Sequence, residues 1–167
     1  YITGVTNYLE FQCVDGSFVY SGKNKQTSKM PSTPEEAMKS PLLSLMQKLK
    51  FKSFLTALAG YEIPGEDGVD SDEDVPLNRM TMRELYKKYG LDENSQTFTG
   101  HAMALQLNDD YLDEPATEIV RAIKLYGYSV NAYGKSPFIY PLYGLGGLPE
   151  GFSRLCGLNG GVFILNQ

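Results

Sequence analysis

Apolar side chains recur with a helical period in the second half of the chain. Ile119, Ile123, Tyr126 and Val130 stand at i, i+4, i+7 and i+11, a spacing that places side chains on one buried helix face. A proline precedes this run and a glycine follows it, as at many helix ends. The pattern predicts a helix over 115–133 that buries this stripe.

A second predicted helix, over 42–58, has more apolar positions than one buried stripe can use. The stripe comprises residues 42, 45, 46 and 49, and apolar residues outside it include Leu43, Phe51, Phe54 and Leu58. A helix packed between neighbours would explain two apolar faces, and so would a helix that lines a hydrophobic groove. The pattern by itself favours the packed helix and leaves the groove open.

Capping signals predict a third helix, over 81–89. Thr81 and Glu84 have the spacing of a capping box, in which each residue binds a free backbone N–H of the other. Gly90 then occupies the position where a left-handed residue closes a helix. Helical structure is also expected over 95–105, although a glycine in this stretch weakens the pattern.

The N-terminal part of the chain has the period of strands. Two β-rich runs, Leu9–Val14 and Ser17–Tyr20, are separated by Asp15-Gly16, which is the residue pair that favours a tight hairpin turn. Residues 21–29 are a loop or a weak third strand. A capping box with proline at the first helical position then predicts a short helix over 33–40.

The C-terminal part predicts an extended segment, Phe138–Tyr140, followed by a glycine-rich turn and a short helix. Pro149 has the first helical position, and Glu150 and Arg154 share one face four residues apart. A second turn precedes a closing strand, Val162–Leu165. Such a piece is most often a buried corner, but its charged edge is also a plausible contact surface.

These elements give an α+β organisation: a hairpin, about five helices, and a strand–helix–strand unit. The chain has 167 residues, 42% of them hydrophobic and 21% charged, which is ordinary for a soluble globular domain. A net charge of −5 argues against a nucleic-acid partner. The only dense basic run, Lys48–Lys52, is interpreted as a solvated helix face, and the acidic run Glu66–Asp74 as an exposed loop.

Residues that could support catalysis are sparse. Neither a phosphate-binding nor a dinucleotide-binding glycine motif is present, and no serine elbow occurs. His101 is the only histidine and is interpreted as structural. The carboxylates of Asp109–Glu114 stand in a row before a helix, where they cap it and keep it soluble. We therefore predict no catalytic residue, metal site or cofactor.

Several separate motifs together resemble the Rab GDP-dissociation inhibitor family, in the family's order, from about Val5 to the last residue. Rab escort proteins share part of this pattern. The motifs are VDGSFVYSG (14–22), FTGHAMAL (98–105), NDDYLDEP (108–115), RAIKLY (121–126) and KSPFIYPLYGLGGLPEGFSRL (135–155).

The resemblance implies a regulator of vesicular transport and not an enzyme. Members bind GDP-bound prenylated Rab GTPases, slow GDP dissociation and extract them from membranes into the cytosol. The family pairs a larger domain similar to flavin-dependent monooxygenases, without the flavin, with a smaller helical domain that shelters the geranylgeranyl tail. Residues 33–134 then correspond to the helical domain, and 1–32 and 135–167 to pieces of the larger one.

With the family in view, a groove becomes the favoured interpretation of the helix over 42–58. The residues that the resemblance implies for the lipid site are Leu42, Leu43, Met46, Ile123 and Tyr126. Burial of a prenyl chain contributes up to about 0.8 kcal/mol per CH₂, so a competing site needs comparable apolar surface. Methionine suits a wall that opens and recloses. The alternative is a groove that is closed when empty and resembles a core.

The resemblance also implies part of a Rab-binding platform. Its candidate residues are Gly147, Glu150, Arg154, Val162 and Ile164. Arg154 matches the family's platform arginine, whereas glutamate, threonine and methionine are usual at 147, 162 and 164. Glu150 is the candidate substitute for the glutamate. We expect an internal fragment of a longer inhibitor, with an escort protein or a flavin-dependent oxidoreductase fragment as alternatives.

Overall fold

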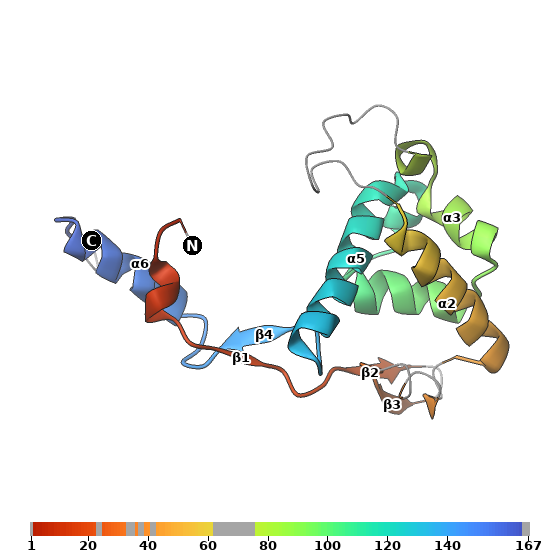
Figure 1. Cartoon of the computed structure of the whole chain (residues 1–167), viewed down its shortest axis with the longest axis horizontal. Helices are drawn as coiled ribbons and strands as arrows, with labels where there is room; N and C mark the ends of the chain where they lie inside the picture. Colours follow the sequence, from red (N-terminus) through yellow and green to blue (C-terminus); the bar gives the residue numbers. More distant parts are fainter. Residues whose placement is uncertain are drawn as a thin grey trace.

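The chain folds into a helical body and a narrow arm that extends from it (Figure 1). The structure is a computed structural model that describes residues 2–22, 25–32, 36, 39–40, 43–61 and 76–164. The helix predicted over 33–40 therefore lies largely outside the described residues, as does Leu42. Both the mixed α and β content and the separation of helices from strands agree with the predicted class.

The core of the body lies between α2 (Leu45–Ala59), α3 (Met82–Tyr89) and α5 (Ala116–Tyr133). Its largest side chains are aromatic. The Phe54 ring lies 5.8 Å from the Tyr86 ring, between centroids, and both side chains are fully buried. This contact joins α2 to α3, while Ile119, Val120 and Ile123 of α5 complete the cluster.

The helix predicted over 42–58 is present, but it begins later and with the opposite face inward. Its N-terminal cap is Ser44, whose hydroxyl accepts a hydrogen bond from the backbone of Gln47. The predicted stripe faces solvent: the side chains of Leu45, Met46 and Leu49 are 69%, 64% and 65% exposed. The face of α2 that packs on the core is the one that carries Phe54 and Leu58.

The helix predicted over 81–89 is confirmed as α3, with both hydrogen bonds of the capping box between Thr81 and Glu84. Gly90 closes it in the left-handed region at φ 64°, where a side chain would be strained. A short 3₁₀ helix, η2 (Pro76–Arg79), precedes the N-terminal end of α3.

The helix expected over 95–105 is confirmed in a broken form. It consists of α4 (Glu93–Thr97) and a π-helical turn, η3 (Phe98–Met103). Gly100 lies in the π-helical turn and has to be a glycine, because a Cβ at this position would lie 2.0 Å from the Tyr111 hydroxyl. Tyr111 belongs to the next 3₁₀ helix, η4 (Asp110–Asp113), and is buried.

The helix predicted over 115–133 is confirmed as α5, with its N-terminal cap at Pro115 and Gly134 closing it at φ 82°. Ile119 and Ile123 are buried as the stripe predicts, and Tyr126 packs against the core from its edge. Val130 is only half-buried, so the stripe faces inward over its first three positions, unlike the stripe of α2.

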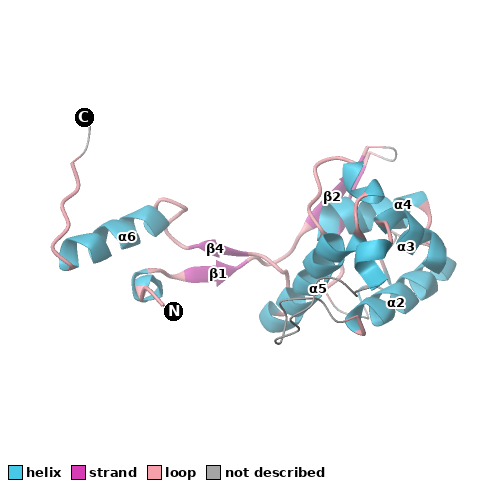
Figure 2. Cartoon of the chain, turned by 90° about the horizontal axis from the view of Figure 1, so that it is seen from above, coloured by secondary structure: helices cyan, strands magenta, loops and turns pink. Residues whose placement is uncertain are grey.

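The predicted hairpin between Leu9–Val14 and Ser17–Tyr20 is wrong. β1 (Phe11–Cys13) pairs with β4 (Ile139–Pro141), and β2 (Phe18–Ser21) pairs with β3 (Gln26–Lys29). Both ladders are antiparallel. The sequence predicted either a loop or a weak strand over residues 21–29, and β3 is that strand. Figure 2 shows β1 and β4 side by side in the arm, far from β2 in the body.

Contacts with a distant segment explain why Asp15-Gly16 makes no hairpin turn. The Lys135 ammonium lies 2.7 Å from a carboxylate oxygen of Asp15, and the Ser17 and Ser136 hydroxyls are 2.9 Å apart. The Val14 N–H donates to the Phe138 carbonyl. Residues 14–17 consequently continue alongside 135–138 instead of turning back, and this junction connects the arm to the body.

The arm ends in α6 (Gly147–Leu158), which packs against a 3₁₀ helix near the start of the chain, η1 (Val5–Tyr8). Pro149 is its third residue, not its first. The closing strand predicted over Val162–Leu165 is wrong for residues 162–164, which pair with no strand in the described chain, and Leu165 lies outside it. The C-terminal corner is also largely exposed, not buried.

No helix in the part of the chain that the structure describes has both the length and the apolar character to cross a membrane.

The two faces of α2 give a direct test of this packing. We expect Phe54→Ala to lower the free energy of unfolding by about 3–5 kcal/mol, because it leaves a cavity among α2, α3 and α5. Leu49→Ala on the exposed face should change it by less than about 0.5 kcal/mol. Urea unfolding followed by circular dichroism measures both, and equal losses would contradict the observed orientation of α2.

Candidate functional site

Two glycines of α6 let η1 pack closely against this helix. Gly147 and Gly151 lie four residues apart on the helix face that meets η1. A Cβ on Gly151 would lie 3.0 Å from the Val5 side chain, and a Cβ on Gly147 would lie 3.8 Å from the Leu9 side chain. Because the face is smooth, η1 can approach the α6 backbone closely, and Val5 becomes buried.

Arg154 lies on the same side of α6, one turn beyond Gly151. The carbon of its guanidinium group is 4.9 Å from the centroid of the Tyr8 ring, within the range of an attractive cation–π contact. The Arg154 side chain is otherwise exposed. Tyr8 thus restricts the guanidinium while its hydrogen-bond donors remain accessible to a partner.

The remaining platform candidates lie at the two ends of α6. Glu150 is exposed in the first turn of α6, near the positive end of the helix dipole. Val162 and Ile164 follow the helix in a segment without regular secondary structure and are 83% and 68% exposed. The structure therefore brings Gly147, Glu150 and Arg154 together on one helix and places the two apolar candidates beyond its C-terminal end.

The lipid-site candidates fall into two environments. Ile123 is buried in the core, and burial raises the pKa of Tyr126 to about 12. Leu43, which precedes the N-cap of α2, is half-buried, and Met46 in the first turn of α2 is exposed. Leu42 lies outside the described residues. Ile123 and Met46 thus occupy opposite ends of the burial scale.

Sequence reasoning missed several residues that the structure makes prominent. Tyr8 and Gly151 shape the surroundings of Arg154, but neither has a local pattern that signals a contact between residues so far apart in sequence. Leu45 and Leu49 extend the exposed apolar surface beside Met46. The excess of apolar positions in α2 was a signal for them, although it did not tell which face is buried.

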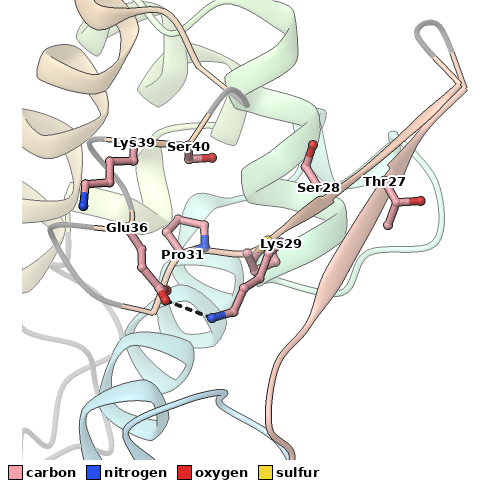
Figure 3. Close-up of a pocket in the computed structure, with 8 residues that line it drawn as sticks. Thr27, Ser28, Lys29, Pro31, Glu36, Lys39 and Ser40 are labelled. Carbon is pink, nitrogen blue, oxygen red and sulfur yellow. Dashed lines mark hydrogen bonds and ion pairs between the residues drawn. The ribbon is translucent and has the colours of Figure 1, made fainter.

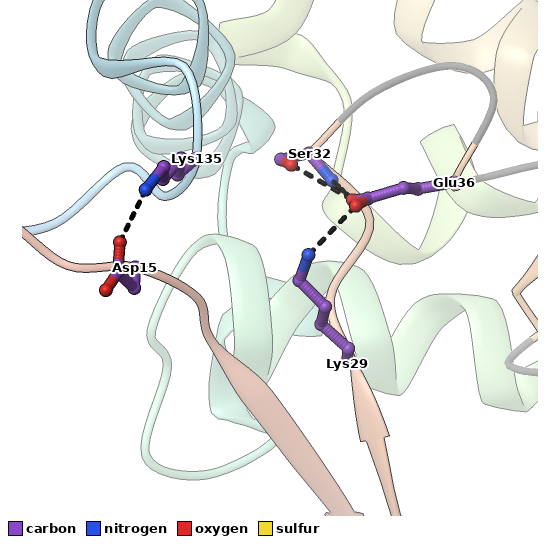
Figure 4. A network of polar contacts seen from close by, with 5 residues as sticks. All are labelled: Asp15, Lys29, Ser32, Glu36 and Lys135. Carbon is purple, nitrogen blue, oxygen red and sulfur yellow. Dashed lines mark hydrogen bonds and ion pairs between the residues drawn. The ribbon is translucent and has the colours of Figure 1, made fainter.

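A cleft of about 380 Å³ lies between β3 and the described residues Pro31, Glu36, Lys39 and Ser40 (Figure 3). Its main charged groups already contact each other: the Lys29 ammonium lies 2.9 Å from a carboxylate oxygen of Glu36. Hydrogen bonds from Lys29 and then from the Ser32 backbone and hydroxyl lower the pKa of Glu36 to about 2 (Figure 4). This network ties Glu36 to Lys29 and Ser32, and it resembles no catalytic arrangement.

The polar residues that sequence reasoning assigned to structural roles have structural contacts. The His101 ring donates from Nδ1 to the Gln106 carbonyl at 2.7 Å, and its other nitrogen lies 3.1 Å from Asp109. Asp113 accepts two hydrogen bonds from Arg83, which lower the pKa of the Asp113 carboxyl. Within the described ranges, no three His, Cys, Asp or Glu side chains form a metal-binding group.

A comparison with protein families identifies the family of the chain. The family model described as GDP dissociation inhibitor matches residues 1–167. The chain belongs to the GDP dissociation inhibitor family. This confirms the resemblance that the separate motifs suggested, and the alternatives of an escort protein and a flavoenzyme fragment are not favoured.

Individual GDP dissociation inhibitors agree with this assignment. The chain is 46% identical over 165 residues to probable secretory pathway GDP dissociation inhibitor 1 of Schizosaccharomyces pombe, and 45% identical over 165 residues to Rab GDP dissociation inhibitor beta of Rattus norvegicus. Each match covers 99% of this chain and 36% of the relative. The chain thus spans about a third of the length of these curated relatives.

The fold agrees as well. A crystal structure of Rab GDI from Plasmodium falciparum matches with a TM-score of 0.78 and 47% sequence identity, over 93% of this chain and 36% of that chain. The arrangement of arm and helical body is therefore similar to that of a solved inhibitor of the same family.

The glycine face of α6 predicts which substitutions separate η1 from α6 in this member of the family. We expect Gly151→Val to separate η1 from α6, because the new side chain would occupy the space of Val5. Amide hydrogen exchange should then speed up across residues 5–8. Gly157→Val on the same helix meets open space and is the control. Equal exchange rates in both variants would contradict the contact.

Proposed function

We propose that this chain takes part in binding GDP-bound prenylated Rab GTPases, slowing GDP dissociation and releasing them from membranes. The observation that carries the proposal is Arg154, an exposed guanidinium group restrained over Tyr8 on a helix that the arm supports. Arginine is frequent at interaction hot spots, and a restrained side chain loses less entropy on binding. Both the Rattus norvegicus relative and the Plasmodium falciparum structure carry Rab in their names.

The contact surface for the GTPase would lie along α6 and the segment after it. In this proposal Arg154 and Glu150 supply charge, and Val162 and Ile164 supply apolar contact at one end. Gly147 has no side chain where the family usually has glutamate, so the charge that Glu150 carries one turn later takes that role. Phe152, 48% exposed on the same helix, adds apolar area.

The geranylgeranyl group would bind at the helical body, with Leu43 and Met46 at the entrance and Ile123 and Tyr126 deeper. Leu42, which the resemblance also implies, lies outside the described residues. Burial of Ile123 and half-burial of Leu43 suit a groove that is closed when empty, in which α2 moves relative to α5 to admit the lipid. The exposed Met46 is flexible enough to cover an isoprenoid chain.

The same proposal covers domain organisation and location. Residues 33–134 would form the lipid-binding domain, and 1–32 and 135–167 would belong to a larger domain similar to flavin-dependent monooxygenases but without a flavin or other cofactor. The protein would act in the cytoplasm without enzymatic activity and reach membranes transiently through its GTPase.

Titration of the chain with fluorescently labelled, GDP-loaded prenylated Rab tests the platform. We expect Arg154→Ala to weaken binding at least tenfold, as for a restrained interface arginine. Arg121→Ala on α5 removes the same group elsewhere and should stay within about twofold. If both variants bind like the unaltered chain, the platform assignment is wrong.

The lipid site is tested by comparing prenylated and unprenylated Rab. We expect Met46→Gln to weaken binding of the prenylated form about three- to tenfold, because a polar side chain replaces apolar contact with the isoprenoid. Binding of the unprenylated form should not change. Leu125→Gln replaces another exposed apolar residue, on α5, and serves as the control. Equal losses with both forms of Rab would exclude a lipid role for Met46.

A further inference from the structure

The outward face of α2 carries apolar and basic side chains next to one another. Leu45, Leu49, Lys52 and Thr56 follow at i, i+4, i+7 and i+11, and all four are exposed. Figure 2 shows α2 at the outer edge of the helical body, with α3 and α4 on its other side. We call Leu45, Leu49 and Lys52 the α2 ridge.

The charge of this segment is opposite to that of the whole chain. Residues 43–61 contain three lysines and no aspartate or glutamate, whereas the chain has a net charge of −5. Lys50 has a structural role, since its ammonium donates to the Gly90 carbonyl at 3.1 Å and so satisfies the end of α3. The side chain of Lys52, in contrast, is exposed on the outward face of α2.

The body has other exposed apolar side chains, such as Leu125 and Tyr128 of α5, but the exposed leucines of α2 lie beside Lys52 in a segment without acidic residues. Leu45 and Leu49 are 69% and 65% exposed and lie one turn apart. Exposed leucines scattered singly are common in soluble proteins, but two leucines one turn apart beside a lysine combine apolar and basic groups, and an anionic membrane interface accepts both. There the apolar side chains enter the headgroup region, and lysines extend toward lipid phosphates.

We propose that the α2 ridge docks directly on the interface of an anionic phospholipid membrane. Charge complementarity favours this occupant, since a chain with net negative charge can approach an anionic surface only through a local basic segment. The inference rests on the proposed function in one respect: Met46 adjoins the ridge, so docking would hold the lipid entrance at the membrane that anchors the prenylated GTPase.

Vesicle co-sedimentation of the chain alone, without a GTPase, tests the proposal. We expect the chain to bind phosphatidylcholine vesicles that contain phosphatidylserine, to bind pure phosphatidylcholine vesicles much more weakly, and to lose binding as salt rises. Lys52→Gln should weaken partitioning about fivefold, and Leu49→Gln about tenfold.

Matched controls separate the ridge from general charge and hydrophobicity. Lys87→Gln on α3 removes the same charge, and Leu125→Gln on α5 removes the same apolar group, each from an exposed position. Each should change partitioning by less than about twofold. Absence of binding to anionic vesicles, or equal losses in ridge and control variants, would overturn the proposal. So would self-association of the chain that Leu49→Gln abolishes, because a second copy would then cover the ridge.

A fluorescent geranylgeranyl analogue distinguishes this inference from the lipid site. Lys52→Gln should leave binding of the analogue unchanged while it weakens vesicle binding. If the chain binds the analogue but not the vesicles, the ridge proposal fails and the lipid site stands. If it binds the vesicles but not the analogue, the lipid site fails and membrane docking stands.

Discussion

The contact of Phe54 with the aromatic side chains of α3 determines how the helical body presents its surface. The Phe54 ring lies between the rings of Tyr86 and Tyr89, with centroid distances of 5.8 Å and 5.6 Å. Phe54 and Leu58, one turn apart, are fully buried, so this face of α2 is the one that packs on the body. Once Phe54 is inside, Leu45, Met46 and Leu49 have to face outward. Both the proposed lipid entrance and the α2 ridge follow from that orientation.

The arm depends on a different constraint, the pairing of two segments that are far apart in sequence. β1 and β4 form a short antiparallel ribbon, and Asp15 and Ser17 contact Lys135 and Ser136 where the ribbon meets the body. This pairing brings η1 to α6, where two glycines permit close packing. The environment of Arg154 is therefore created by both ends of the described chain.

The two surfaces differ in how they acquire their properties. On α6, the backbone holds the site: glycines admit η1, and Tyr8 then restrains the Arg154 guanidinium. On α2, Leu45, Met46 and Leu49 are largely exposed, so their adaptability is the useful property. A rigid charged contact suits recognition of a folded GTPase, whereas an adaptable apolar surface suits a flexible isoprenoid or a lipid interface.

Local signals in the sequence determined the helices of the body. The capping box of Thr81 and Glu84, the left-handed glycines at 90 and 134, and the stripe of α5 depend on residues within a few turns of one another, so they could be predicted. The motif series likewise determined the family, and with it Arg154 as a candidate. Asp15-Gly16 shows the limit, because its hairpin preference is weaker than the contacts that residues 135–138 supply from across the chain.

Only the tertiary structure decided which face of α2 is buried, which strands pair, and that Tyr8 lies under Arg154. Helical periodicity reports that a face is apolar but not what covers it. Strand patterns report that a segment is extended but not which edge it meets. These choices depend on contacts between distant residues, such as Phe54 with Tyr86 or Gln12 with Tyr140, whose energies appear only when the chain has folded.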